Sequence, residues 1–288
     1  MNVKHILNEI EKVDPDVYGK LDTRRHAMKS FFRVSGKVAL AAMPVMLGGM
    51  FKKAYGQGGG SGLFDILNYA LTLEYLEDEF YKAALAAPNL IPAGAATGAI
   101  QTIGAHETAH VNLLRSAITA AQGTPVSKPT FDLSGGNGSN NGPFKDAVTT
   151  NYALFLAVAQ TFEDTGVRAY KGQAAMDALI ANNDVLQVAL QIHSVEARHA
   201  SHIRQMRKAN GGLVPSGVNV KPWITGKQSG IDTTAVQASY DGEEITTQAT
   251  IQITGIAPGI SADAASEAFD EPLTMAAVLQ IVDPFIVP

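Results

Sequence analysis

Four long segments place apolar residues three or four positions apart, which is the spacing of helices with one buried face. The predicted helices span about 63–86, 94–121, 144–170 and, from an N-cap at Asn183 or Asp184, up to 210. Pro88, Gly123 and Gly211 follow three of them, as expected at helix ends. A Gly/Asn/Ser-rich stretch, 134–142, separates the second helix from the third. The pattern predicts an all-α fold, a four-helix bundle with a long crossover between helices two and three.

Acidic residues and histidines interrupt the apolar faces at equivalent places in the two halves of this bundle. Glu74, Tyr81, Glu107, His110 and Arg115 recur 89 positions later as Glu163, Tyr170, Glu196, His199 and Arg204. Each half therefore carries a lone Glu on one helix and a Glu-x-x-His pair on the next. A crossover that runs the length of the bundle relates the halves by a pseudo-two-fold axis and brings both pairs to the same depth.

The repeated acidic and imidazole residues are candidate metal ligands: Glu74, Glu107, His110, Glu163, Glu196 and His199. Burying a carboxylate costs several kcal/mol unless a positive charge neutralises it. Two divalent cations supply four positive charges against four glutamates, and neutral imidazoles complete the coordination. Carboxylate and imidazole ligands suit both iron and manganese. A metal-free network that shares protons among the same residues is the alternative.

The composition limits the classes of partner. The 288-residue chain has a net charge of −5 and a pI near 5.8, which argues against nucleic acid or an anionic membrane as the main partner, because both call for a basic surface. The chain contains no cysteine, so disulfides are excluded and any metal must be held by Glu, Asp and His.

Other polar residues share the inner faces of the predicted helices. Tyr81 and Tyr170 each follow a lone glutamate by seven residues. Their side chains either hydrogen-bond the metal ligands or donate electrons, or they are core residues whose hydroxyl finds a partner. We take both as candidate catalytic residues. The repeat counterpart of Glu77 is Gly166, so Glu77 is interpreted as a helix-edge carboxylate, with an outer ligand or proton acceptor as the alternative.

Several basic residues flank the candidate ligands. Arg115 and Arg204 are expected to point off the inner face toward neighbouring acids. His106, His193 and His202 are expected to be solvated or structural, with a proton relay as the alternative.

The first 56 residues form a separate region. Arg24 and Arg25 precede an apolar stretch, 38–50, and a small-residue site at Gly56, which is the order of a twin-arginine export signal. Cleavage there predicts an exported, periplasmic protein, whereas a retained amphipathic arm predicts a cytoplasmic one. The apolar stretch is shorter than the roughly 20 residues of a membrane span, so no integral span is expected in the mature form.

The rest of the chain divides into the bundle, 57–212, and a carboxyl-terminal extension, 213–288, that is mostly irregular. Ile251 and Ile253 alternate with polar residues and predict a short strand. Pro272 at a first helical position predicts a short helix up to about Ile281. We expect the extension to pack over one end of the bundle.

The duplicated Glu and Glu-x-x-His set, over about 63–210, resembles the ferritin-like superfamily of di-iron and di-manganese carboxylate proteins. The segments 73–77 and 195–200, with Glu271-Pro-Leu near the end, are similar to the ferritin-like group related to plant desiccation-related proteins, many of whose bacterial members carry export signals. The resemblance implies that the six candidate residues hold two metal ions, with the two tyrosines near them. The long segment after Gly212 departs from ferritins and argues against a closed cage, although a homodimer fits.

The resemblance implies an oxidoreductase of the ferroxidase or peroxidase type, acting on dioxygen, hydrogen peroxide or ferrous iron in stress protection. The alternative is a non-catalytic metal-binding protein, or a structural protein that protects against desiccation or other stress. In that case the same ions only stabilise the fold.

Overall fold

The computed structural model describes residues 61–288. The predicted export signal lies outside the described residues. Within the described part, none of the helices combines the length and the apolar character that crossing a membrane requires.

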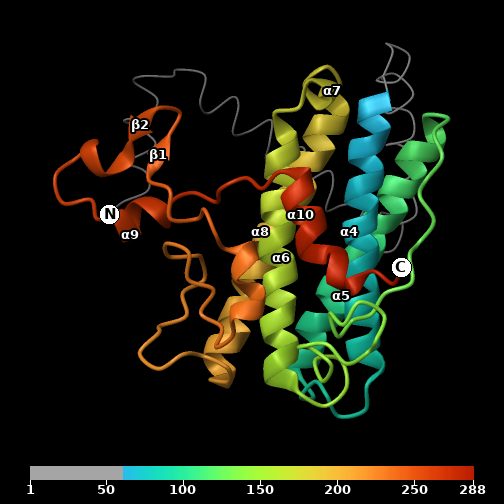
Figure 1. Cartoon of the computed structure of the whole chain (residues 1–288), viewed down its shortest axis with the longest axis horizontal. Helices are drawn as coiled ribbons and strands as arrows, with labels where there is room; N and C mark the ends of the chain where they lie inside the picture. The colour runs from blue at the N-terminus through green and yellow to red at the C-terminus, as the bar shows by residue number, and fades with distance from the viewer. Residues whose placement is uncertain (1–60) are drawn as a thin grey trace, which may run out of the picture. The chain divides into compact units, whose positions relative to one another are not determined.

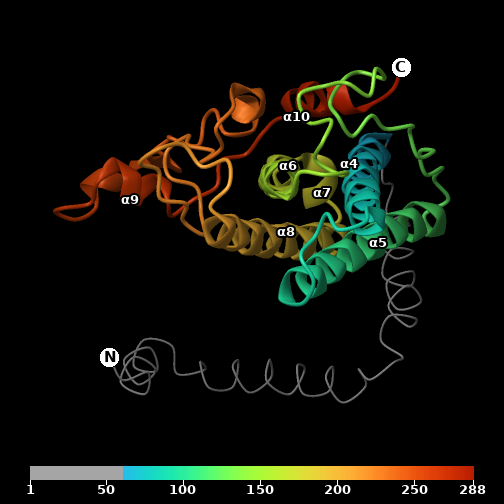
Figure 2. The same cartoon turned by 90° about the horizontal axis from the view of Figure 1, so that it is seen from below.

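The fold is an all-α bundle, as the sequence predicted. Its four long helices are α4 (Ser61–Ala86), α5 (Ala95–Ala120), α6 (Tyr152–Ala174) and α8 (Asn183–Asn210), and the short α7 (Asp177–Ile180) lies between α6 and α8. Helix α4 packs on α5 and α6 packs on α8, and further contacts join α4 to α6 and α5 to α8 (Figure 1). Seen along the bundle, the four helices surround one interior (Figure 2).

The third helix begins eight residues later than predicted, at Tyr152 instead of 144. Asn151 has an extended backbone and its side chain accepts a hydrogen bond from the amide of Leu154 at 3.0 Å, so it caps the helix at this point. The preceding residues form turns, and the amide of Phe144 donates to the carbonyl of Ser134. The apolar pattern of 144–150 therefore reports burial in the crossover and not a helix.

The fourth helix has its N-cap position at Asn182, just before the predicted one, although the Asn182 side chain donates to the carbonyl of Ala178 at 2.8 Å and does not cap the helix. The helix ends at Gly211, whose φ of 68° lies in the left-handed region. The crossover that leads to the third helix is tied by the buried Asp132, whose carboxylate accepts the amides of Gly138 and Asn140, each at 2.9 Å.

The extension consists of short elements: η1 (Thr234–Ser239), β1 (Thr247–Gln248), β2 (Ile251–Gln252), η2 (Ile253–Gly255), α9 (Ala262–Ser266), α10 (Met275–Val282) and η3 (Asp283–Phe285). The predicted strand exists only as a two-residue partner of β1 in an antiparallel pair. The last helix starts at Met275 and not at Pro272, because Thr274 is its N-cap and accepts from the amide of Ala277 at 3.2 Å.

Two elements of the extension, η1 and α10, pack on α6 at the side of the bundle, and not across one end as expected, whereas β1, β2 and α9 project away from it (Figure 1). Helix α10 packs on the side of α6 that faces away from α8 (Figure 2). The buried Arg168 of α6 donates to the carbonyls of Ser239, Asp241 and Glu271 and pairs with Glu243 at 2.6 Å. One arginine thus ties two separate segments of the extension, 239–243 and the stretch at Glu271, to the bundle.

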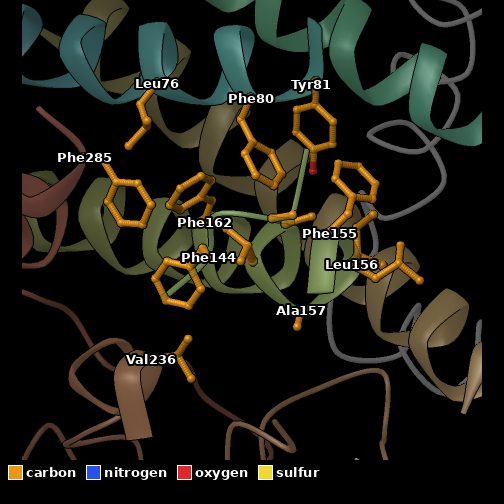
Figure 3. Packing of buried hydrophobic residues seen from close by; sticks show 14 of the residues in the cluster. Leu76, Phe80, Tyr81, Phe144, Phe155, Leu156, Ala157, Phe162, Val236 and Phe285 are labelled. Atoms are coloured by element: carbon orange, nitrogen blue, oxygen red, sulfur yellow. The ribbon is translucent and has the colours of Figure 1, made fainter. Parts of the chain in front are cut away.

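Aromatic rings fill the bundle between α4 and α6 (Figure 3). Phe80 stacks on Phe155 at 5.3 Å between ring centroids and meets Phe162 edge-on at 5.0 Å. Phe285 of the extension meets Phe162 edge-on at 5.0 Å, so the core continues into the carboxyl-terminal segment.

Candidate metal centre

The structure brings all six predicted ligands together in the middle of the bundle. They come from all four long helices: Glu74 from α4, Glu107 and His110 from α5, Glu163 from α6, and Glu196 and His199 from α8. The four glutamates are 0% exposed, although each occupies a position where the helix otherwise presents apolar residues. The carboxylates of the centre are therefore out of contact with bulk water.

The ligand atoms form two groups around the two histidines. Nδ1 of His110 lies 3.1 Å from a carboxylate oxygen of each of Glu74, Glu107 and Glu196. Nδ1 of His199 lies 2.9 Å from Glu107 and 3.1 Å from Glu163 and Glu196. Glu107 and Glu196 belong to both groups, and each gives one oxygen to each group. Glu74 and Glu163 belong to one group each.

These distances fit a shared cation better than hydrogen bonds. An imidazole nitrogen has one hydrogen or one lone pair, so it makes one good hydrogen bond and not three. Ligand atoms that lie about 2.1 Å from one octahedral ion are about 3.0 Å from one another. One buried oxygen of Glu107 and one of Glu196 have no hydrogen-bond partner among the described residues. Both oxygens face a histidine nitrogen, where a cation would satisfy them.

The electrostatics of the centre call for positive charge. Burial raises the pKa of Glu74 to about 8. Burial would lower the pKa of His110 and His199, but the negative charge of Glu74 and Glu163, respectively, and hydrogen bonds with the carboxylates raise both. Without cations, protons neutralise the cluster, so a bound cation takes the place of protons.

The two tyrosines contact the terminal ligands crosswise. Tyr170 of α6 donates a 2.5 Å hydrogen bond to Glu74 of α4, and Tyr81 of α4 donates to Glu163 of α6. Burial and the adjacent carboxylate raise the pKa of both hydroxyls. Both tyrosines are thus buried core residues whose hydroxyls hydrogen-bond candidate ligands, so the structure contains features of both interpretations.

Glu77 is a member of the centre that the sequence placed wrongly at a helix edge. It is 5% exposed, and burial and four neighbouring glutamates raise its pKa. A Cβ at Gly166 would lie 3.4 Å from its carboxylate and 3.5 Å from Cγ of Glu196, so both acids lie against α6 at this glycine. The pairing of an inner acid with glycine at the repeat position was the signal that could have located it.

One of the flanking histidines reaches the centre. Nδ1 of His106 lies 3.0 Å from Nε2 of His199, and the two rings stack at 5.2 Å. The repeat counterpart of His106 is Val195, so His110 has no equivalent neighbour. The two ligand groups therefore have equivalent carboxylates, but only the histidine of the second group, His199, has a second histidine against it.

The remaining flanking residues have structural contacts. His193 contacts the carbonyl of Val167 at 2.9 Å, and His202 is exposed. Arg204 pairs with the buried Asp164, an acid as expected, whereas Arg115 donates to the hydroxyl of Tyr75 at 3.2 Å.

Comparison with known families agrees with this geometry. A family model described as a ferritin-like domain matches residues 62–209, which contain all six candidate ligands, both tyrosines and Glu77. Neither the curated proteins nor the solved structures gave a match.

Proposed function

The chain belongs to the ferritin-like domain family, and on this premise we propose that its centre binds two divalent ions, iron or manganese, and reduces dioxygen or hydrogen peroxide. The observation that carries the proposal is the position of Glu107 and Glu196. Each directs one oxygen toward Nδ1 of His110 and the other toward Nδ1 of His199. Carboxylates shared in this way suit a pair of adjacent ions.

The ligands divide naturally between the two ions. Glu74 and His110 would complete one coordination sphere, and Glu163 and His199 the other. When bound, two redox-active ions supply one electron each to the substrate. Dioxygen that gains two electrons and two protons becomes hydrogen peroxide, and hydrogen peroxide that gains the same becomes two water molecules. An external reductant, or fresh ferrous iron, restores the electrons.

The surrounding side chains hold the ligands and the protons. Tyr81 and Tyr170 fix the terminal carboxylates by hydrogen bonds. Glu77 has a raised pKa and lies beside Glu196, so it can hold the proton that the substrate takes up. Burial of the glutamates excludes water from the reaction. Removal of oxidants or of ferrous iron by such a centre would serve stress protection.

Elemental analysis followed by oxygen consumption tests this function. The protein is purified, loaded with ferrous iron without oxygen, and mixed with dioxygen or hydrogen peroxide. We expect two ions per chain and rapid oxidation, both lost in Glu107→Gln and kept in Glu79→Gln, whose carboxylate lies on the outside of α4 beside Lys128. Equal rates in the parent and Glu107→Gln would contradict catalysis at this centre. Bound metal that stabilises the protein without turnover would favour the structural alternative.

A further inference from the structure

An apolar cavity lies between the four long helices and α7. Helix α7 lies at one end of the bundle (Figure 1). Its volume is about 30 Å³. Side chains from the four long helices and from α7 line it, and all are hydrophobic apart from Tyr69, Tyr170 and Gln173. Because a water molecule needs at least about 10–15 Å³, the cavity has room for one or two small molecules.

The cavity adjoins the first ligand group, that of His110. Its lining residues Ala70, Leu114 and Ile192 lie one helical turn from Glu74, His110 and Glu196, respectively, on the same helix faces. Tyr170 also lines the cavity and donates its hydroxyl to Glu74 at 2.5 Å. This side chain therefore forms part of the boundary between the cavity and the ligands.

The equivalent region of the other half is filled with rings. The lining residues Ile66, Leu73 and Ala169 correspond in the repeat to Phe155, Phe162 and Phe80. These three rings pack against one another beside Tyr81 (Figure 3). The pseudo-symmetry of the ligands is thus broken in the packing, and the smaller side chains lie beside the first ligand group.

We propose that this cavity is a dioxygen site that supplies the first ligand group. The inference rests on the proposed function and selects dioxygen over hydrogen peroxide as the substrate. Dioxygen has no hydrogen bonds to water to lose, whereas each hydroxyl of peroxide must be paired when it is buried. The hydroxyl of Tyr170 is already committed to Glu74.

Two polar groups remain in the lining of the cavity. The hydroxyl of Tyr69 has no partner among the described residues, and the amide of Gln173 is the other polar group that lines the cavity. The rest of the lining is apolar, so dioxygen loses nothing on entering, whereas peroxide would have to pair both hydroxyls with these two groups alone.

Xenon tests the cavity without depending on turnover, because xenon occupies dry apolar cavities. Crystals of the full chain are pressurised with xenon. Leu73→Phe and Ile66→Phe copy the rings of the other half and fill the cavity, and Leu190→Phe on the exposed face of α8, at 44% exposure, makes the same chemical change outside it. We expect xenon in the parent and Leu190→Phe, and none in the two filled variants.

A second experiment compares the rates at which dioxygen and hydrogen peroxide oxidise the ferrous-loaded proteins. We expect at least about fivefold slower reaction with dioxygen in Leu73→Phe, an unchanged reaction with hydrogen peroxide, and unchanged iron content, because only the apolar cavity is filled. If Leu73→Phe fails to fold, Ile66→Phe gives the same comparison. A parent without xenon, or a filled variant without xenon that reacts with dioxygen at the parental rate, would overturn the proposal.

Two further outcomes separate this inference from the function on which it rests. Equal slowing with both oxidants overturns the cavity's role and leaves the catalytic centre intact. Uptake of xenon by a loaded parent that reacts with neither oxidant contradicts the proposed function, and with it the supply of dioxygen.

Discussion

Glu107 and Glu196 occupy repeat-related positions, and each carboxylate lies between the same two histidines, within 3.1 Å of both Nδ1 atoms. The two glutamates come from α5 and α8, which lie in opposite halves of the chain. Each bound ion would therefore depend on both halves, and the two sites would share two ligands. This sharing makes the consequences of substitution different for the shared and the terminal glutamates.

Substituting a shared glutamate and substituting a terminal glutamate should remove different numbers of metal ions. In Glu196→Gln we expect both ions to be lost, with affinity lower by at least about 100-fold, because changes even to groups that support ligands cost 10–100-fold. In Glu163→Gln we expect one ion to remain. Metal content after equilibrium dialysis measures both, with Glu79→Gln as the control. The same loss in Glu163→Gln and Glu196→Gln would contradict the shared arrangement.

Metal removal should destabilise the fold. A ligand present at about 1,000 times its dissociation constant adds about 4 kcal/mol to the free energy of unfolding, which for a domain of this size corresponds to roughly 8–16 °C in Tm. Calorimetry of the protein before and after chelation, and after reloading with manganese, measures the change. A Tm that chelation leaves unaltered would exclude a cation bound to the native state.

The stabilisation of the fold by bound metal should increase with pH. In the metal-free protein, burial raises the pKa of Glu74 from its ordinary 4.5 to about 8. The folded state therefore favours the protonated carboxyl, and the stability linked to this proton is full below pH 4.5 and is lost as pH rises through 8. A cation replaces the proton, so the loaded protein does not lose this stability. We expect the Tm difference between loaded and metal-free protein to be larger at about pH 8.5 than at about pH 6; the reverse order would be inconsistent with this charge balance.

The tyrosines should position the terminal carboxylates. Tyr81→Phe removes the hydrogen bond to Glu163, and we expect a loss of about 1–3 kcal/mol in stability together with slower oxidation at nearly full metal content. Tyr75→Phe, whose hydroxyl contacts Arg115 instead of a ligand, is the matched control on the same helix. Oxidation rates of loaded variants measure the effect. Identical rates in Tyr81→Phe and Tyr75→Phe would leave Tyr81 as a core residue.

The extension should depend on Arg168. Arg168→Met leaves the carboxylate of Glu243 buried without its partner and three carbonyls without a donor, so we expect a loss of about 3–5 kcal/mol. Proteolysis between 240 and 272 should become faster, while metal binding persists because Arg168 is not a ligand. The exposed Arg198→Met is the control. Unchanged proteolysis would show that other contacts hold the extension.

The bundle and the six candidate ligands could be predicted from the sequence, because a constant offset between two helical repeats puts equivalent residues on equivalent helix faces. It failed where one half departs from the other. Glu77 was misplaced because the residues that surround its side chain, Gly166 of α6 and Glu196 of α8, come from other helices. The start of α6 was misjudged because apolar residues of the crossover continue the helical rhythm up to the cap at Asn151.

The position of the extension depended on tertiary contacts that leave no periodic pattern. Arg168 lies on α6 among core residues, and its acceptors are mostly backbone carbonyls, which carry no sequence signal. The cavity was also invisible in the pattern, because Leu73 and its counterpart Phe162 are both ordinary apolar residues. Only their packing distinguishes the two halves.

Anomalous diffraction from crystals of the metal-loaded protein tests the central claim most directly. Data collected at the iron or manganese absorption edge locate the ions independently of any activity. We expect two peaks between Glu107 and Glu196, one beside His110 and the other beside His199. A featureless interior in crystals of protein that has been loaded to saturation, or peaks confined to the surface, would contradict the account.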